Sequence, residues 1–136
     1  MSLTIWKIKD LELEYNNADY EQAEKLKACL DKMAEDEKAL KKDGPMGEFL
    51  RGYCEMYYNL FKNMFGEDVA NKLAKRSDSA EWENVYIDFL NFITAQNADA
   101  EARRATIIAK AKEEKNKNGN RQQRRNAQKK HAKHYN

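Results

Sequence analysis

The segment from Met46 to Phe65 constrains the fold most, because no other part of the chain is as rich in large apolar side chains. Apolar residues on a single face predict a surface helix, whereas residues on several faces predict a central, buried helix. Here they cover more than one face: Phe49, Leu50, Tyr53, Cys54, Met56, Tyr57, Leu60, Phe61, Met64 and Phe65. They cannot all turn inward in a chain of 136 residues, so some are expected to form a groove or a self-association surface.

A first long helix is predicted before this central one, over residues 18–42. Its apolar residues recur at spacings of three, four and seven, and so form one stripe: Ala23, Leu26, Leu30, Met33 and Leu40. Glu37 interrupts the stripe. Asn16 and Asn17 offer N-caps. The helix is expected to stop at Asp43-Gly44-Pro45, because the residue before a proline is pushed out of the helical region.

A short helix and a third long helix are predicted after the central one. The short helix covers residues 67–74, with Val69 and Leu73 facing inward. Ser77-Asp78-Ser79 provides the cap of the third long helix. The inner face of that helix consists of Trp82, Val85, Tyr86, Phe89, Leu90, Phe92 and Ile93. Asn97-Ala98-Asp99 is predicted to break it.

The first fifteen residues alternate in a way that is typical of strands. Two short strands joined at Lys9-Asp10 would place Leu11, Leu13 and Tyr15 on one buried face. A two-stranded hairpin is only marginally stable alone, so this one is expected to pack on the helices.

Charge divides the chain into an acidic body and a basic end. From Lys115 onward there are eight Lys or Arg and no acid, so the remainder holds 25 − 8 = 17 basic residues against 23 acids, a net of −6. Residues 116–136 lack the apolar side chains that would offset the entropy of ordering them, which predicts disorder at least when unbound. The basic side chains there include Arg121, Arg124, Arg125, Lys129 and Lys130.

Together these patterns predict a mainly α fold, in which a short N-terminal β-hairpin packs on a small bundle of three long helices plus a short helix. Residues 1–96 are expected to form this helical body. Residues 97–115, rich in Ala, Lys, Glu and Arg, form a helical extension, since these residues favour helix. Residues 116–136 form a disordered basic C-terminal tail.

No pattern of catalytic or cofactor-binding residues stands out. Cys29 and Cys54 lie in helical patterns without a neighbouring His, which favours free thiols in a reducing cytoplasm. His131 and His134 are three apart, but the last twenty residues hold no Cys or acid to complete a metal site. No apolar run approaches the ~20 residues of a membrane span. We therefore expect a cytoplasmic protein that is not an enzyme, has no cofactor or metal and does not contact a membrane.

Several motifs follow one another in a recognisable order. They are a hairpin at Ile5–Tyr15, the run Asn59–Leu73 with Phe65-Gly66-Glu67 at a helix end, the aromatic helix Tyr86–Ile93, and Asn120-Arg121-Gln122-Gln123-Arg124-Arg125. This order resembles a family of small siphophage proteins of Gram-positive hosts that is similar to phage tail assembly chaperones. One departure is Leu73-Ala74-Lys75-Arg76, where relatives often carry Phe-Gly after the leucine.

The resemblance implies a role in phage or prophage tail assembly within the bacterial host cytoplasm. Such proteins bind the tape measure protein, or other tail proteins, before the tail tube polymerises, and a self-associated homo-oligomer is also compatible. A long chain with an apolar seam aggregates unless the seam is covered. By similarity, the candidate partner contacts are Tyr53, Tyr57, Phe61, Phe89 and Phe92.

Two other functions stay open from the sequence. The basic tail fits a small helical regulator that binds nucleic acid through salt-dependent phosphate contacts. The tail lacks interleaved aromatic residues, so base stacking is not indicated. A structural tail or connector subunit of the virion is the third hypothesis.

Overall fold

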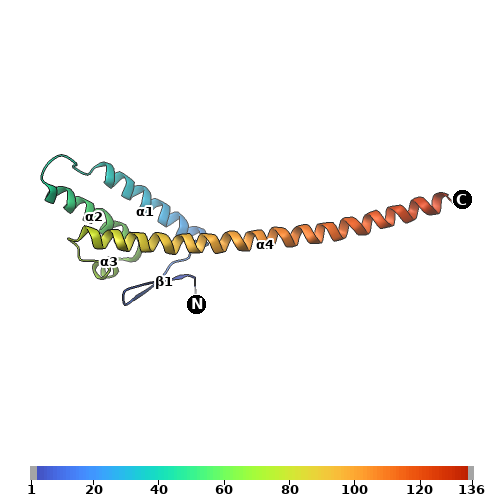
Figure 1. Ribbon diagram of the computed structural model, residues 1–136, viewed down its shortest axis with the longest axis horizontal. Helices are drawn as coiled ribbons and strands as arrows, with labels where there is room; N and C mark the ends of the chain where they lie inside the picture. The colour runs from blue at the N-terminus through green and yellow to red at the C-terminus, as the bar shows by residue number, and fades with distance from the viewer. Residues whose placement is uncertain (1–2, 135–136) are drawn as a thin grey trace. The chain divides into compact units, whose positions relative to one another are not determined.

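The computed structural model describes the backbone of residues 3–134 and the side chains of residues 3–117. The elements follow in the order β1, β2, α1, α2, α3 and α4 (Figure 1). This confirms the predicted mainly α fold, with a short hairpin, three long helices and one short helix. The chain comprises two compact units, Met1–Ala98 and Asp99–Asn136.

The N-terminal hairpin pairs β1 (Ile5–Ile8) with β2 (Leu11–Glu14) in antiparallel register, with Trp6 opposite Leu13. A turn of two residues needs a backbone conformation that favours glycine, and Lys9 adopts it with φ +54°. Leu13 is buried on the predicted face, and its partner Trp6 is buried there with it. The hairpin therefore inserts an indole ring into the core.

Helices α1 (Tyr20–Lys38) and α2 (Met46–Phe65) form an antiparallel pair (Figure 1). The N-cap of α1 is Asp19, whose carboxylate accepts from the Glu21 backbone N–H; the predicted caps Asn16 and Asn17 make other contacts. Helix α1 also ends earlier than predicted, at Lys38, because the following loop turns Leu40 toward α2. A Cβ atom at Gly52 would lie 2.8 Å from Leu40 Cδ2, so this glycine makes room for the leucine.

Helix α3 (Glu67–Leu73) follows α2 through Gly66, whose φ of +98° favours glycine. Helix α4 (Ser79–His134) then begins beside it. The Asp78 carboxylate accepts from the Glu81 backbone N–H at 3.2 Å and so caps α4, as predicted for Ser77-Asp78-Ser79.

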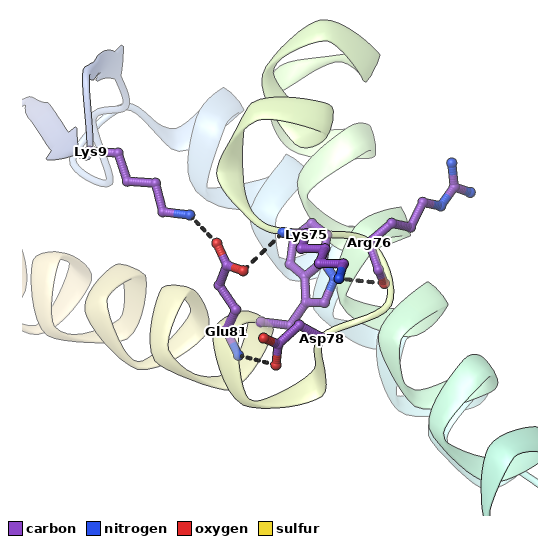
Figure 2. Close-up of polar contacts among 6 residues, drawn as sticks. Lys9, Lys75, Arg76, Asp78 and Glu81 are labelled. Atoms are coloured by element: carbon purple, nitrogen blue, oxygen red, sulfur yellow. Dashed lines mark hydrogen bonds and ion pairs between the residues drawn. The ribbon is translucent and has the colours of Figure 1, made fainter.

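Glu81 also ties this joint to the hairpin turn. Figure 2 shows its carboxylate between Lys9 and the backbone of Lys75. The Lys9 ammonium forms an ion pair with one oxygen, and the Lys75 N–H donates to the other at 3.1 Å. Nearby, the Trp82 indole N–H donates to the Arg76 carbonyl at 3.2 Å. The start of α4 is thus fixed from two directions.

An aromatic core lies between the hairpin, α2 and the first turns of α4. The Trp6 ring centroid lies 5.8 Å from that of Phe61 and 4.9 Å from that of Phe89. Phe61 also stacks on Trp82, with ring centroids 6.0 Å apart. The Trp6 indole N–H donates to Asp88 at 2.7 Å, so its polar atom is paired.

Helix α4 differs from the prediction in two respects. No break occurs at Asn97-Ala98-Asp99, because Asn97 bonds Asn17 and Asp99 pairs with Arg103 one turn on, so neither side chain competes for the helix backbone. The backbone is also helical over residues 116–134, where the sequence predicts a disordered tail. Ala, Gln, Lys and Arg favour helix, and an existing helix extends without a new nucleation step.

Candidate partner-binding surface

The predicted contact residues divide between the core and the surface. Phe61 and Phe89 are fully buried, each with 0% of its side chain exposed. Phe92 is half-buried and packs toward Trp6, with ring centroids 6.4 Å apart. Only Tyr53 and Tyr57 come together elsewhere, on the α2 face beside α4. In this conformation Phe61 and Phe89 therefore serve packing.

Tyr53 and Tyr57 belong to a continuous row of apolar side chains. Ring centroids lie 5.6 Å apart for Phe49 and Tyr53, 5.0 Å for Tyr53 and Tyr57, and 5.2 Å for Tyr57 and Tyr86. Spacings of four along α2 place its three members on one side of that helix. Tyr86 continues the row onto α4.

Two further α4 residues extend this row into solvent. Ile87 is 55% exposed and Leu90 is 38% exposed, and they lie within one turn of Tyr86 on the same side of α4. We call the whole surface the aromatic strip, which consists of Phe49, Tyr53, Tyr57, Tyr86, Ile87 and Leu90. Tyr57 is buried and forms its floor, whereas the others are half-buried or exposed.

Hydrogen bonds hold the rings of Tyr53 and Tyr57 in the strip. The Tyr53 hydroxyl donates to the Glu83 carboxylate at 2.8 Å and lies 2.9 Å from the Tyr57 hydroxyl. A tyrosine hydroxyl has one proton, so Tyr53 donates to Glu83 and accepts from Tyr57. The two tyrosine rings are thus held in fixed orientations by polar bonds as well as by packing.

The tyrosines of the strip stay protonated. Burial, followed by the hydrogen bonds with Tyr57 and Glu83, raises the pKa of Tyr53 well above its ordinary value. Burial raises the pKa of Tyr57 and the pKa of Tyr86 in the same direction. The strip therefore offers neutral hydroxyls rather than a phenolate base.

Two carboxylates act on the tyrosines of the strip. Glu83 on α4 and Glu37 on α1 both raise the pKa of Tyr57, and Glu37 also raises that of Tyr86. Glu83 is bonded to Tyr53, and the Glu37 carboxylate forms no ion pair with another described side chain. The negative charge of two exposed carboxylates therefore acts on the tyrosines of the strip.

The strip continues toward the loop between α1 and α2. A surface hollow of about 340 Å³ there is lined by Lys42, Gly44, Met46 and Phe49. Met46 is 70% exposed. This hollow lies at the N-terminal end of α2, where the strip begins.

Sequence reasoning missed the α4 half of this surface. The sequence pattern predicts Tyr86 and Leu90 on the inner face of their helix and gives no prediction for Ile87. The available signal was the spacing of Glu83, Tyr86, Ile87 and Leu90, which puts all four on one side of a helix. A second signal was Glu37, an acid inside an apolar stripe.

The predicted basic residues Arg121, Arg124, Arg125, Lys129 and Lys130 lie where only the backbone is described, and so do His131 and His134. Among the side chains of residues 3–117, no group of three or more His, Cys, Asp or Glu is arranged to hold a metal. Cys29 and Cys54 are free thiols, and burial raises the pKa of each. Within the described part of the chain, no helix is long and apolar enough to cross a membrane.

Comparison with known proteins yields one family. The model of a family of unknown function, DUF6673, matches residues 9–128. No curated protein and no solved structure matches the chain.

Proposed function

This chain belongs to DUF6673, a family of unknown function, and we propose that it acts as a tail assembly chaperone-like protein of a phage or prophage. In this role it binds the tape measure protein, or another tail protein, during tail morphogenesis in the cytoplasm of the bacterial host. Two observations support this role: the order of the sequence motifs, which resembles that of tail assembly chaperones, and the aromatic strip at the surface of the helices.

The aromatic strip is the observation that carries the proposal. A soluble helical body rarely keeps a continuous row of aromatic and aliphatic side chains at its surface without a partner for it. A strip along two helices fits the apolar face of a third, which is the helix-in-groove mode of recognition. A tape measure protein is a long helical chain that offers such faces.

The proposed role is binding without catalysis. Two hydroxyls of the strip are already engaged, with Tyr57 bonded to Tyr53 and Tyr53 bonded to Glu83. Such groups orient a partner by hydrogen bonding and exclude water around an apolar contact. Reversible binding of this kind is sufficient for a chaperone, because covering an apolar seam prevents aggregation without any chemical step.

Coexpression with the tape measure protein from the same genome tests this function. We expect a complex that can be purified and a gain in soluble tape measure protein. The double variant Ile87→Asp/Leu90→Asp should lose both, because it puts two charges on the exposed part of the strip. Ala28→Asp/Asn71→Asp adds the same charge at two exposed positions outside the strip and should keep both. Absence of a complex with the unmodified chain would refute the proposal.

Nucleic-acid binding is the second candidate, favoured by the eight basic residues and the absence of acids from Lys115 onward. It predicts binding to RNA or DNA that weakens steeply with salt and disappears when residues 116–136 are deleted. No binding at low salt would eliminate it.

A structural tail or connector subunit is the third candidate. Mass spectrometry of purified particles separates it from a chaperone, because a chaperone leaves before the virion is complete.

A further inference from the structure

Positive charge is concentrated in the last part of α4. Residues 115–134 contain eight Lys or Arg and no Asp or Glu. The stretch before them, residues 99–114, contains four basic and four acidic residues, so its net charge is 4 − 4 = 0. The charge of residues 115–134, which we call the basic end, is therefore not offset by any acid within it.

The basic end is part of one continuous helix. The backbone of α4 is helical without a break from Ser79 to His134 (Figure 1). At about 1.5 Å per residue, the basic end is about 30 Å long. This is more than twice the roughly 12 Å width of the major groove of B-DNA, so a helix of this length can reach phosphates on both strands.

The composition of the basic end suits base edges better than a protein groove. Besides three Arg, it contains three Gln and four Asn. The guanidinium group of Arg matches the acceptors of guanine in the major groove, and the amides of Asn and Gln match adenine. Its only aliphatic residues are two alanines, so it lacks the apolar anchors with which a helix docks in a groove of a protein.

The form of nucleic acid follows from two further properties. The basic end contains no Phe, Trp or Tyr, so it offers a single strand no aromatic ring on which to stack its bases. An α-helix with its side chains is about 10–12 Å across and fits the major groove of B-DNA. The major groove of duplex RNA is deep and narrow, and side chains cannot read it. Duplex DNA is therefore the best match.

We propose that the basic end binds duplex DNA as a helix that lies in the major groove. Its Lys and Arg residues neutralise phosphates, and its Asn, Gln and Arg residues contact base edges. This inference rests on nucleic-acid binding, the second candidate function, and deepens it by naming the target and the mode of binding. It does not depend on the tape measure protein.

Fluorescence anisotropy with the full chain tests the target. The probes are a short DNA duplex, the RNA duplex of the same sequence, and one of the DNA strands alone. At low salt the DNA duplex should bind more than about ten-fold more tightly than either of the other probes. Its affinity should fall linearly on a log–log plot against salt concentration.

A pair of variants at Ala127 tests the mode of binding, because both keep every charge. Ala127→Pro breaks the helix in the middle of the basic end, and Ala127→Gln keeps it. Circular dichroism should show lower helicity for the proline variant alone. That variant should bind the DNA duplex more than about ten-fold more weakly, whereas the glutamine variant should bind like the unmodified chain.

A second pair of variants tests which charges meet the phosphates. Arg124→Ala/Arg125→Ala should reduce the slope of log affinity against log salt by about 2, since each phosphate contact contributes about 0.9. Lys41→Ala/Lys42→Ala removes two exposed positive charges from the loop between α1 and α2 and should leave the slope unchanged. Equal effects of the two variants would show that net charge, rather than the basic end, attracts the DNA.

Two results would overturn the proposal while nucleic-acid binding itself stands. One is an RNA duplex or a single strand that binds as tightly as the DNA duplex. The other is a proline variant that binds the DNA duplex like the unmodified chain. A chain that binds none of the probes at low salt would overturn the proposal together with the second candidate function.

Discussion

The side-chain amide of Gln96 donates to the main-chain carbonyl of Tyr15 at 2.6 Å, across 81 positions of sequence. The same amide donates to the Leu3 carbonyl at 2.6 Å, and its oxygen accepts from the Asn17 backbone N–H at 2.8 Å. One buried side chain on α4 thus satisfies three backbone groups at the base of the hairpin. It holds the hairpin where Trp6 can enter the core.

Replacing Gln96 with Leu should destabilise the fold by about 3 kcal/mol, because buried backbone groups left without partners cost roughly 1–3 kcal/mol each. The leucine has a similar size, so the loss reports polar pairing rather than volume. Urea denaturation followed by tryptophan fluorescence measures it, since Trp6 and Trp82 both lie in the core.

The neighbouring Asn97 provides the control for Gln96. Its side chain accepts from the Asn17 side chain at 2.7 Å, but it is exposed to solvent, which can replace the bond. Asn97→Ala should therefore cost less than about 1 kcal/mol. Equal losses for the two variants would show that the buried amide is not the anchor of the hairpin.

The contact of Lys9 with Glu81 should make stability depend on pH in the acidic range. The hydrogen bond from Lys9, followed by that from the Lys75 N–H, lowers the pKa of Glu81 below its ordinary 4.5. A carboxyl whose pKa is lower in the folded chain than in the unfolded chain stabilises the fold at pH values above its unfolded pKa. This stability is lost as the pH falls through the pKa of the folded chain. The difference in unfolding free energy between the unmodified chain and Glu81→Gln should have its largest value above about pH 5 and should decrease as the pH falls below it.

Glu12→Gln is the matched control for this pH dependence. It removes one carboxylate from the same hairpin, where Glu12 pairs with Lys7 at 3.9 Å and both side chains are exposed. Such a pair contributes little to stability. If the two variants show the same pH profile, the link between the hairpin turn and α4 has no energetic role.

Tyr15 should make stability depend on pH in the alkaline range. Burial raises its pKa from 10.0 to about 12, and its hydroxyl donates to Asn17 at 2.6 Å. A raised pKa in the folded state gives stability that is complete below the unfolded value of about 10 and is lost as the pH rises toward 12. Chemical denaturation across this range should show a shallower alkaline decline for Tyr15→Phe. An unchanged decline would contradict the burial of this hydroxyl.

The sequence predicted the elements of the fold because their signals are local. The apolar richness of 46–65, the cap at Ser77-Asp78-Ser79 and the alternation around Lys9-Asp10 each act within a few residues. Helix α2 has the predicted bounds, and the hairpin has the predicted turn. Pairing across long separations carries no such signal, so the roles of Trp6 and Gln96 were not predicted.

The candidate site was harder to predict because the sequence pattern of a helical aromatic residue is the same whether the ring lies in the core or at the surface. Tyr53 and Phe61 differ by eight positions on α2, which puts them on nearby sides of the same helix. The depth of each depends on the arrangement of α1, α4 and the hairpin around α2. In particular, Trp6 from the hairpin covers Phe61 and Phe89, whereas the described structure leaves the side of α4 with Ile87 and Leu90 open.

This division between core and surface gives a last prediction. Phe61→Ala should destabilise the fold by about 3–5 kcal/mol, because it removes a fully buried ring and leaves a cavity beside Trp6. Leu90→Ala should cost less than about 1 kcal/mol, because Leu90 is 38% exposed and solvent can fill the space that its side chain leaves. In urea denaturation the midpoint should fall sharply for the first and little for the second. In a partner-binding assay Leu90→Ala should weaken binding while the chain stays folded, whereas Phe61→Ala acts through unfolding. If Phe61→Ala left stability intact, the ring would be a contact residue after all, as the resemblance implies.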